Sequence, residues 1–195
     1  MAAMTNSWST PGRRADMFLP AGDDPRAGAA PPDGERAVLA AFLRGQRATL
    51  ELKCSGLDAA ALARRSAEPS TMSLLGLVRH LADVERGWMR ARVAGQNVAP
   101  RFRSAADPDG DFDGAVADPE VVAGAWRAWR EETAFTDRLL SSASGLDAEV
   151  RYVGHDGGAV RVSLREVVVH LIEEYARHNG HADLLRERVD GRVGE

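Results

Sequence analysis

Residues 163–185, SLREVVVHLIEEYARHNGHADLL, decide the fold class and carry the first functional signal. Ser163 and Glu166 form a Ser-x-x-Glu capping box, so a helix is expected to begin here and to run to about Val189, before Gly191. Steps of three and four residues along this helix predict one inward-facing seam. The seam comprises Leu164, Val167, Leu171, Glu174, His178, His181 and Leu185.

Glu174 and His178 interrupt this seam with a carboxylate and an imidazole. Positions i and i+4 of a helix lie on one face, so the two side chains can bind a single ion. A carboxylate among apolar neighbours costs several kcal/mol unless a counter-charge or a metal receives it. The alternative interpretation is a wet groove or a salt bridge with an arginine, because Glu and His at this spacing are common on solvated helices.

Composition restricts the class of protein. The chain has 195 residues, 44% hydrophobic and 28% charged, which suits one globular domain with a substantial core and a tail. The net charge of −4, without a block rich in Lys and Arg, argues against nucleic acid as a partner. No run of about 20 apolar residues is available to span a membrane.

A single cysteine, Cys54, excludes an intramolecular disulfide and fits a cytoplasmic location. At the end of an amphipathic helix it is expected to be a small buried hydrophobe rather than a reactive thiol. Residues 1–32 contain five prolines among Gly, Ala and Asp and are expected to form a flexible extension. Residues 33–190 then form the domain.

Four long helices are predicted within this domain. The first runs from Asp33, a candidate N-cap, to Lys53, with Gly56 closing its end, and the second from about Ser73 to Val93. Asp118 followed by Pro119 opens the third, and residues 163–189 form the fourth. The fold class predicted is therefore all-α, a four-helix bundle.

Shorter features connect these helices. A short helix is expected over residues 58–65, and residues 94–117, rich in Gly, Pro and Asp, are expected to form a long surface connection. Two apolar runs, 150–153 and 159–162, flank a glycine-rich turn and predict a small hairpin before the last helix. His155 lies in that turn and is expected to be solvated.

His80, on the inner face of the second helix, is the candidate partner for Glu174 and His178. Metal sites in bundles are built by inward side chains of facing helices. Two nitrogens and one oxygen leave a fourth position for water or substrate, as in a catalytic zinc site, although nickel or ferrous iron also fits this ligand set. His170, four residues before Glu174, lies one step off the seam and is treated as a flanking residue.

Two stretches resemble a known family. Residues 73–88, SLLGLVRHLADVERGW, and residues 173–181, EEYARHNGH, resemble the DinB/YfiT-like metalloenzyme superfamily, and more narrowly its actinobacterial DinB-like group of unknown function. The resemblance covers about Glu35 to Arg188. It implies an up-down-down-up bundle, often a homodimer, whose divalent metal is held by one His of the second helix and two ligands of the last.

Carried over, the resemblance implies His80, Glu174 and His178 as metal ligands. Most relatives have His-x-x-x-His on the last helix, and Glu174 replaces the first of these, as in the similar mycothiol-dependent maleylpyruvate isomerase branch. His181 stands where many relatives have Gln, so it is a neighbour candidate rather than a ligand. The carboxylate lowers the net charge of the site by one relative to three imidazoles.

The favoured functional hypothesis is activation of a low-molecular-weight thiol of the mycothiol type for transfer to, or isomerisation of, an electrophilic substrate, because a bound cation converts a thiol to thiolate. Further candidates are arginines that could receive a substrate carboxylate and aromatic residues that could wall the pocket, although solvated charges and core packing are the simpler interpretations. They are Arg79, Arg86, Arg177, Trp88 and Tyr175. Two alternatives stay open: a non-catalytic, stress-related metal or thiol binder, and a structural helical dimer with a polar seam.

Overall fold

The computed structural model describes residues 18–19, 24, 26, 32–154 and 156–194. Most of the expected N-terminal extension, and His155, lie outside these residues. The elements in chain order are α1 (Glu35–Cys54), α2 (Ala59–Ala63), α3 (Leu74–Glu85), the π-helix η1 (Arg86–Val93), α4 (Gly110–Asp113), α5 (Pro119–Ser142), β1 (Glu149–Val153), β2 (Ala159–Ser163) and α6 (Leu164–Asp190).

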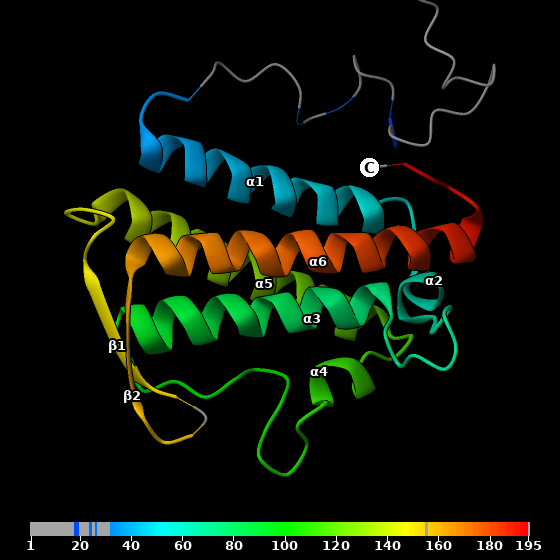
Figure 1. Cartoon of the computed structure of the whole chain (residues 1–195). Helices are drawn as coiled ribbons and strands as arrows, with labels where there is room; N and C mark the ends of the chain where they lie inside the picture. Colours follow the sequence, from blue (N-terminus) through cyan, green and yellow to red (C-terminus); the bar gives the residue numbers. More distant parts are fainter. Residues whose placement is uncertain (1–17, 20–23, 25, 27–31, 155, 195) are drawn as a thin grey trace, which may run out of the picture.

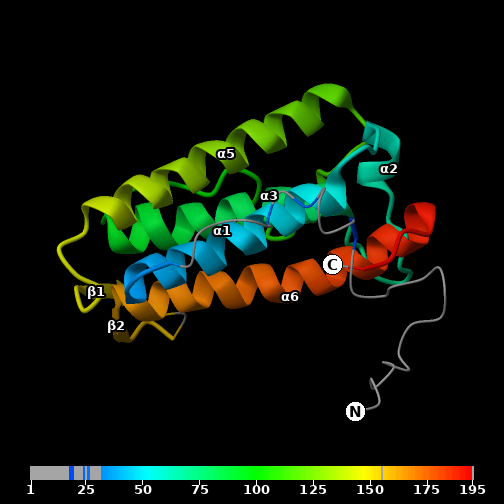
Figure 2. The same cartoon turned by 90° about the horizontal axis from the view of Figure 1, so that it is seen from above.

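Four long helices form the body of the molecule, which confirms the predicted all-α bundle. Helices α1 and α6 run in one direction, and α3 and α5 run in the other, so the chain order is up-down-down-up (Figures 1 and 2). Helix α1 packs along α6, α3 packs along α5, and α3 also contacts α6. The pair α3 and α6 is therefore the pair that can present the predicted ligands to one another.

Side-chain caps explain where most helices begin. The side chains of Asp58, Ser73, Asp118 and Ser163 each accept a hydrogen bond from a backbone N–H in the first turn of the helix that follows. The predicted capping box at Ser163 is confirmed. The predicted cap at Asp33 is wrong: α1 starts after Gly34, whose φ of 80° lies in the region that favours glycine, and it has no side-chain cap.

Two predictions about the middle of the chain need correction. The expected second helix divides, because after Glu85 the backbone continues as η1, where the N–H of Ala94 bonds the carbonyl of Met89 five residues earlier. The connection 94–117 is not wholly a surface segment. It forms α4 against α3, and Asp111 in that turn is buried.

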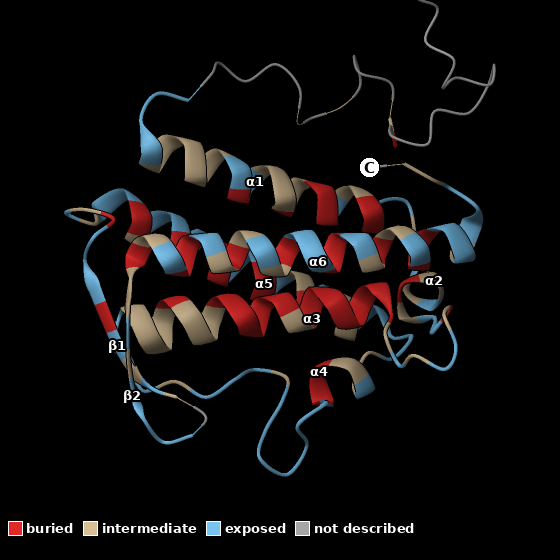
Figure 3. Cartoon of the chain, in the orientation of Figure 1, coloured by how far each residue is buried: buried red, intermediate tan, exposed pale blue. Residues whose placement is uncertain are grey.

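The hairpin is confirmed, with β1 and β2 antiparallel and Val150 opposite Val162. The core is made by residues that all four long helices bury, and most of α3 is buried (Figure 3). Its largest fully buried apolar members include Leu43, Leu50, Leu77, Leu81, Leu171 and Leu185. Among the described residues, no helix is both long and apolar enough to cross a lipid bilayer.

Candidate metal centre

The three predicted ligands converge in space. His80 comes from α3, Glu174 and His178 come from α6, and one ligand atom of each lies within 4.8 Å of the others. The Nε2 atom of His178 is 3.5 Å from Glu174 Oε2, and the Nε2 atom of His80 is 4.0 Å from the same oxygen. The two imidazole rings meet edge to face with centroids 4.6 Å apart.

These distances suit a cation better than mutual hydrogen bonding. Gaps of 3.5 and 4.0 Å are too long for the three groups to satisfy one another. Donor atoms about 2.0–2.1 Å from a tetrahedral zinc ion stand about 3.3–3.4 Å apart, so small side-chain movements would bring the group to that spacing. Two imidazole nitrogens and one carboxylate oxygen are also the donor types that zinc accepts. The residues present therefore fit a divalent metal.

The burial of the group is that of a partly open site. The side chains are 19% exposed for His80, 26% for Glu174 and 11% for His178. The histidines are therefore largely shielded, whereas Glu174 reaches solvent. The group is therefore neither sealed in the core nor fully on the surface.

Both histidines direct Nε2 toward Glu174, and other groups contact their Nδ1 atoms. Asp111 Oδ2, from α4, lies 2.8 Å from Nδ1 of His80. Nδ1 of His181 lies 3.3 Å from Nδ1 of His178. An imidazole whose outer nitrogen is engaged in this way has its tautomer and ring orientation restricted, which is the usual arrangement around metal-ligating histidines.

Protonation states also favour a ligand role. Burial, together with the positive charges available on His80, His181 and Arg177, lowers the pKa of His178 to about 4. The imidazole is therefore neutral at physiological pH, which is the form that binds metals. For Asp111, burial is the largest influence and raises the pKa, but the hydrogen bond and charge of His80, the backbone N–H of Phe112 and the charge of Arg103 together outweigh it, so the pKa lies below its usual value.

The remaining candidates occupy different positions. Nε2 of His170 lies 3.5 Å from Oε1 of Glu174, and its ring packs 4.6 Å from that of Trp88. These two residues adjoin the ligand group. Tyr175 instead lies fully buried in the bundle core, where its hydroxyl donates to Glu85, as its alternative assignment to core packing anticipated.

The three candidate arginines are also separated by the structure. Arg79 of α3 donates to the backbone carbonyls of Gly110 and Asp111, so its role is structural: it fixes α4 against α3. Arg86 donates to the carbonyl of Ala99 and to Glu132. Arg79 and Arg86 therefore differ from the sequence-based expectation that they are solvated charges on a helix face. Arg177 is exposed, next to His178.

Asp111 is the residue that sequence reasoning missed. It lies in the connection between the second and third long helices, where no helical periodicity assigns a direction to a side chain. Three aspartates occur between residues 109 and 113, and nothing in their spacing distinguishes the middle one. Only the folded position of α4 against α3 brings it to His80.

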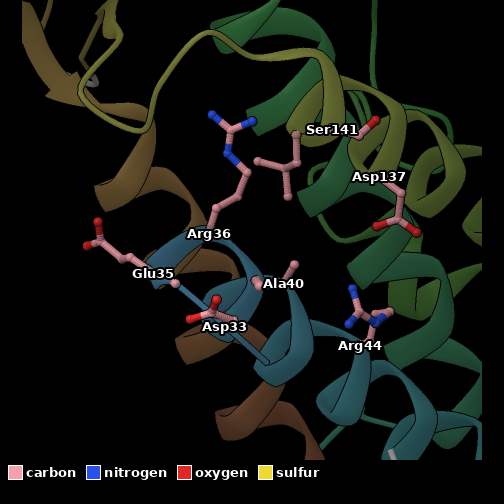
Figure 4. Close-up of a pocket in the computed structure, with 10 residues that line it drawn as sticks. Asp33, Glu35, Arg36, Ala40, Arg44, Asp137 and Ser141 are labelled. Carbon is pink, nitrogen blue, oxygen red and sulfur yellow. The ribbon is translucent and has the colours of Figure 1, made fainter. Parts of the chain in front are cut away.

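A separate hollow of about 580 Å³ lies where the start of α1 meets the end of α5 (Figure 4). Its lining includes Asp33, Glu35, Arg36, Arg44 and Asp137, and it contains none of the three ligand candidates. Charges of both signs line it, which indicates no preference for one class of ligand. The converging group between α3 and α6 is therefore the better candidate site.

The bundle order and the inward His/Glu/His group define a DinB-like helical protein. More narrowly, the model of the mycothiol-S-transferase family matches residues 38–191, and the chain belongs to this family. A solved structure of a conserved protein from Enterococcus faecalis is similar in fold, with a TM-score of 0.54 and 15% identity, covering 79% of this chain and 96% of that chain. No curated protein matches the chain.

Proposed function

We propose that this chain is a divalent-metal-dependent enzyme that activates a mycothiol-type thiol. The activated thiol would be transferred to an electrophilic substrate or would serve in the isomerisation of that substrate. The family name indicates mycothiol-related transfer. The observation that carries the metal part is the meeting of three ligand atoms, from two helices, within 4.8 Å. Zinc is the metal we propose, with nickel and ferrous iron as alternatives that the donor set also accepts.

His80, Glu174 and His178 would hold the cation, and three protein ligands leave a position for an exchangeable one. A divalent cation there would lower the pKa of a bound thiol and keep it as the thiolate nucleophile. The carboxylate of Glu174 would compensate one positive charge of the cation, and the neutral imidazole of His178 leaves its metal-binding lone pair available.

We propose that the substrates approach past His170 and Trp88. Nε2 of His170 lies 3.5 Å from Oε1 of Glu174, and the His170 side chain is partly exposed, so this residue stands at the edge of the ligand group. The Trp88 ring beside it, which also contacts Tyr152 and the Arg92 guanidinium, would form one side of this approach. In this arrangement the metal-loaded site would bind the thiol sulfur, and side chains of η1 and α6 would orient the electrophilic substrate.

Mass spectrometry of reaction mixtures tests the proposal. Protein loaded with zinc, nickel or ferrous iron is incubated with mycothiol and a panel of electrophiles, and mycothiol conjugates or isomerised products are measured. Wild type is expected to turn over with at least one metal, and Glu174→Gln is expected to lose most of that turnover. Glu173→Gln changes an exposed neighbour on the same helix and is the matched control.

Turnover by wild type that persists in Glu174→Gln would contradict the assignment of the site. Stoichiometric binding of metal and thiol, without turnover of any electrophile, would overturn the enzymatic proposal in favour of the non-catalytic binder. Absence of stoichiometric metal from protein purified without chelator would favour the structural polar seam. The homodimer and the cytoplasmic location stay predictions, which light scattering and cell fractionation would test.

A further inference from the structure

We infer that Asp111, on the short helix α4, is a positioning residue that directs Nε2 of His80 toward Glu174 and His178. The inference rests on the proposed metal centre, and it assigns to the connection between η1 and α5 a role in building that centre. It predicts that metal affinity depends on a residue 31 positions away from His80 along the chain.

The contact between Asp111 and His80 is short, buried and specific. Oδ2 of Asp111 lies 2.8 Å from Nδ1 of His80, and the aspartate side chain is only 3% exposed. Its other oxygen, Oδ1, accepts the backbone N–H of Phe112 at 3.1 Å. A neutral imidazole has one N–H, so donating it from Nδ1 leaves the lone pair on Nε2, the atom that faces the other two ligands.

The neighbouring aromatic residue restrains the same ring. Phe112 stacks on His80 with centroids 5.2 Å apart and planes at 26°. The approach of α4 depends on Gly76, since a Cβ there would lie 2.8 Å from a Phe112 ring carbon. The imidazole is therefore held by a hydrogen bond to its edge and by a ring against its face.

Helix α3 itself anchors the turn that carries Asp111. Arg79, adjacent to His80, donates from Nε to the carbonyl of Asp111 and from Nη2 to that of Gly110, both at 2.8 Å. Its guanidinium also lies 4.3 Å above the ring of Phe102. The same helical segment thus presents the ligand and fixes the group that orients it, which is the kind of support that metal-binding histidines receive.

Competition for zinc against a chromogenic chelator tests the role of Asp111. Outer partners of metal-ligating histidines typically contribute a factor of about 10–100 to metal affinity. We expect a loss in that range for Asp111→Ala and a smaller one for Asp111→Asn, whose amide oxygen can still accept from Nδ1. Asp113→Asn is the matched control, because Asp113 belongs to the same turn but pairs with Arg65 at the surface.

Coupling to His80 distinguishes positioning from general loosening of the fold. In a His80→Ala background, Asp111→Ala is expected to cause no further loss of zinc affinity. An equal loss in both backgrounds would overturn the inference, as would wild-type affinity in Asp111→Ala. Asp111→Asn keeps the shape of the side chain and is less disturbing to the fold than Asp111→Ala. A decrease in zinc affinity, smaller than that of the alanine variant, is therefore expected in Asp111→Asn even if Asp111→Ala folds poorly.

Nitrogen NMR of the metal-free protein supplies a readout that does not depend on metal. His80 is expected to be the Nδ1–H tautomer in wild type and to shift toward Nε2–H in Asp111→Ala. An Nε2–H tautomer in wild type would overturn the inference. A wild type that binds no zinc but shows the Nδ1–H tautomer would refute the proposed function while leaving the hydrogen bond established.

Discussion

Two polar clusters lie between α3 and α6, and they differ in how far their atoms satisfy one another. In the first, which we call the closed cluster, the buried carboxylate of Glu85 accepts from Arg47 of α1, Thr136 of α5 and Tyr175 of α6. In the second, the open cluster of His80, Glu174 and His178, the facing atoms stand 3.5 Å or more apart.

The comparison separates two reasons for polarity inside a bundle. Arg47 neutralises Glu85 through a 2.6 Å ion pair, and Trp129 donates to the Tyr175 hydroxyl at 2.7 Å, so the closed cluster joins all four long helices without need of a ligand. In the open cluster, the metal-binding atoms of the three side chains face one another but stand 3.5 Å or more apart. The closed cluster is of the kind that can specify how helices pack, whereas the open cluster has the arrangement that the proposed metal centre requires.

The largest expected effect would break the closed cluster. Glu85→Ala leaves the buried Arg47 guanidinium without its main counter-charge, and loss of one member of a buried pair typically destabilises by about 3–5 kcal/mol. Denaturant unfolding of the metal-free protein measures this. Glu187→Ala, at an exposed position of α6, is the control and is expected to change stability by less than about 0.5 kcal/mol. Similar stabilities of the two variants would show that the closed cluster does not hold the bundle.

Acid is expected to act on the open cluster. The pKa of His178 is about 4 in the folded protein against 6.5 without its surroundings, because of burial and positive neighbours. Between these values the unfolded chain binds the extra proton, so stability falls as pH decreases from about 6.5 to about 4, by up to about 3 kcal/mol. Urea unfolding of chelator-treated protein across this range measures the loss. His178→Gln should flatten the profile, and an unchanged slope would contradict the assigned environment.

Zinc should stabilise the protein through the open cluster alone. At a free zinc concentration 100 times the Kd, binding to the folded state adds about 2.7 kcal/mol. Glu174→Gln is expected to lose most of this gain, while Glu173→Gln keeps it, since Glu173 is exposed on the neighbouring position. Thermal unfolding with and without zinc checks both. A gain retained in Glu174→Gln would mean that zinc binds elsewhere.

The two clusters were not equally predictable from the sequence. Glu174 and His178 lie four residues apart on a largely apolar seam, and His80 lies on the inner face of the second predicted helix. Together with the resemblance, these local signals predicted all three residues of the open cluster. The bundle followed from capping residues and seam periodicity, which are local. Asp111 could not be found, because an irregular connection assigns its side chains no direction. The π-helical turn after Glu85 was also missed, since a pattern of 3.6 residues per turn cannot indicate a change of hydrogen-bond register.

The smallest expected effect concerns Cys54. It tests whether the buried thiol of the chain reacts, or only a thiol bound at the open cluster. Burial raises the pKa of this thiol to about 12, so almost none of it is thiolate at neutral pH and it is a poor nucleophile. Cys54→Ala is therefore expected to change mycothiol-dependent turnover less than about twofold, and a thiol reagent should label native wild type only at the rate of unfolding. Rapid labelling of native protein, or loss of turnover in Cys54→Ala, would place reactive sulfur within the chain. An inert Cys54 is the outcome that the proposed function requires, since in that proposal the reacting thiol enters from solvent and reaches the open cluster.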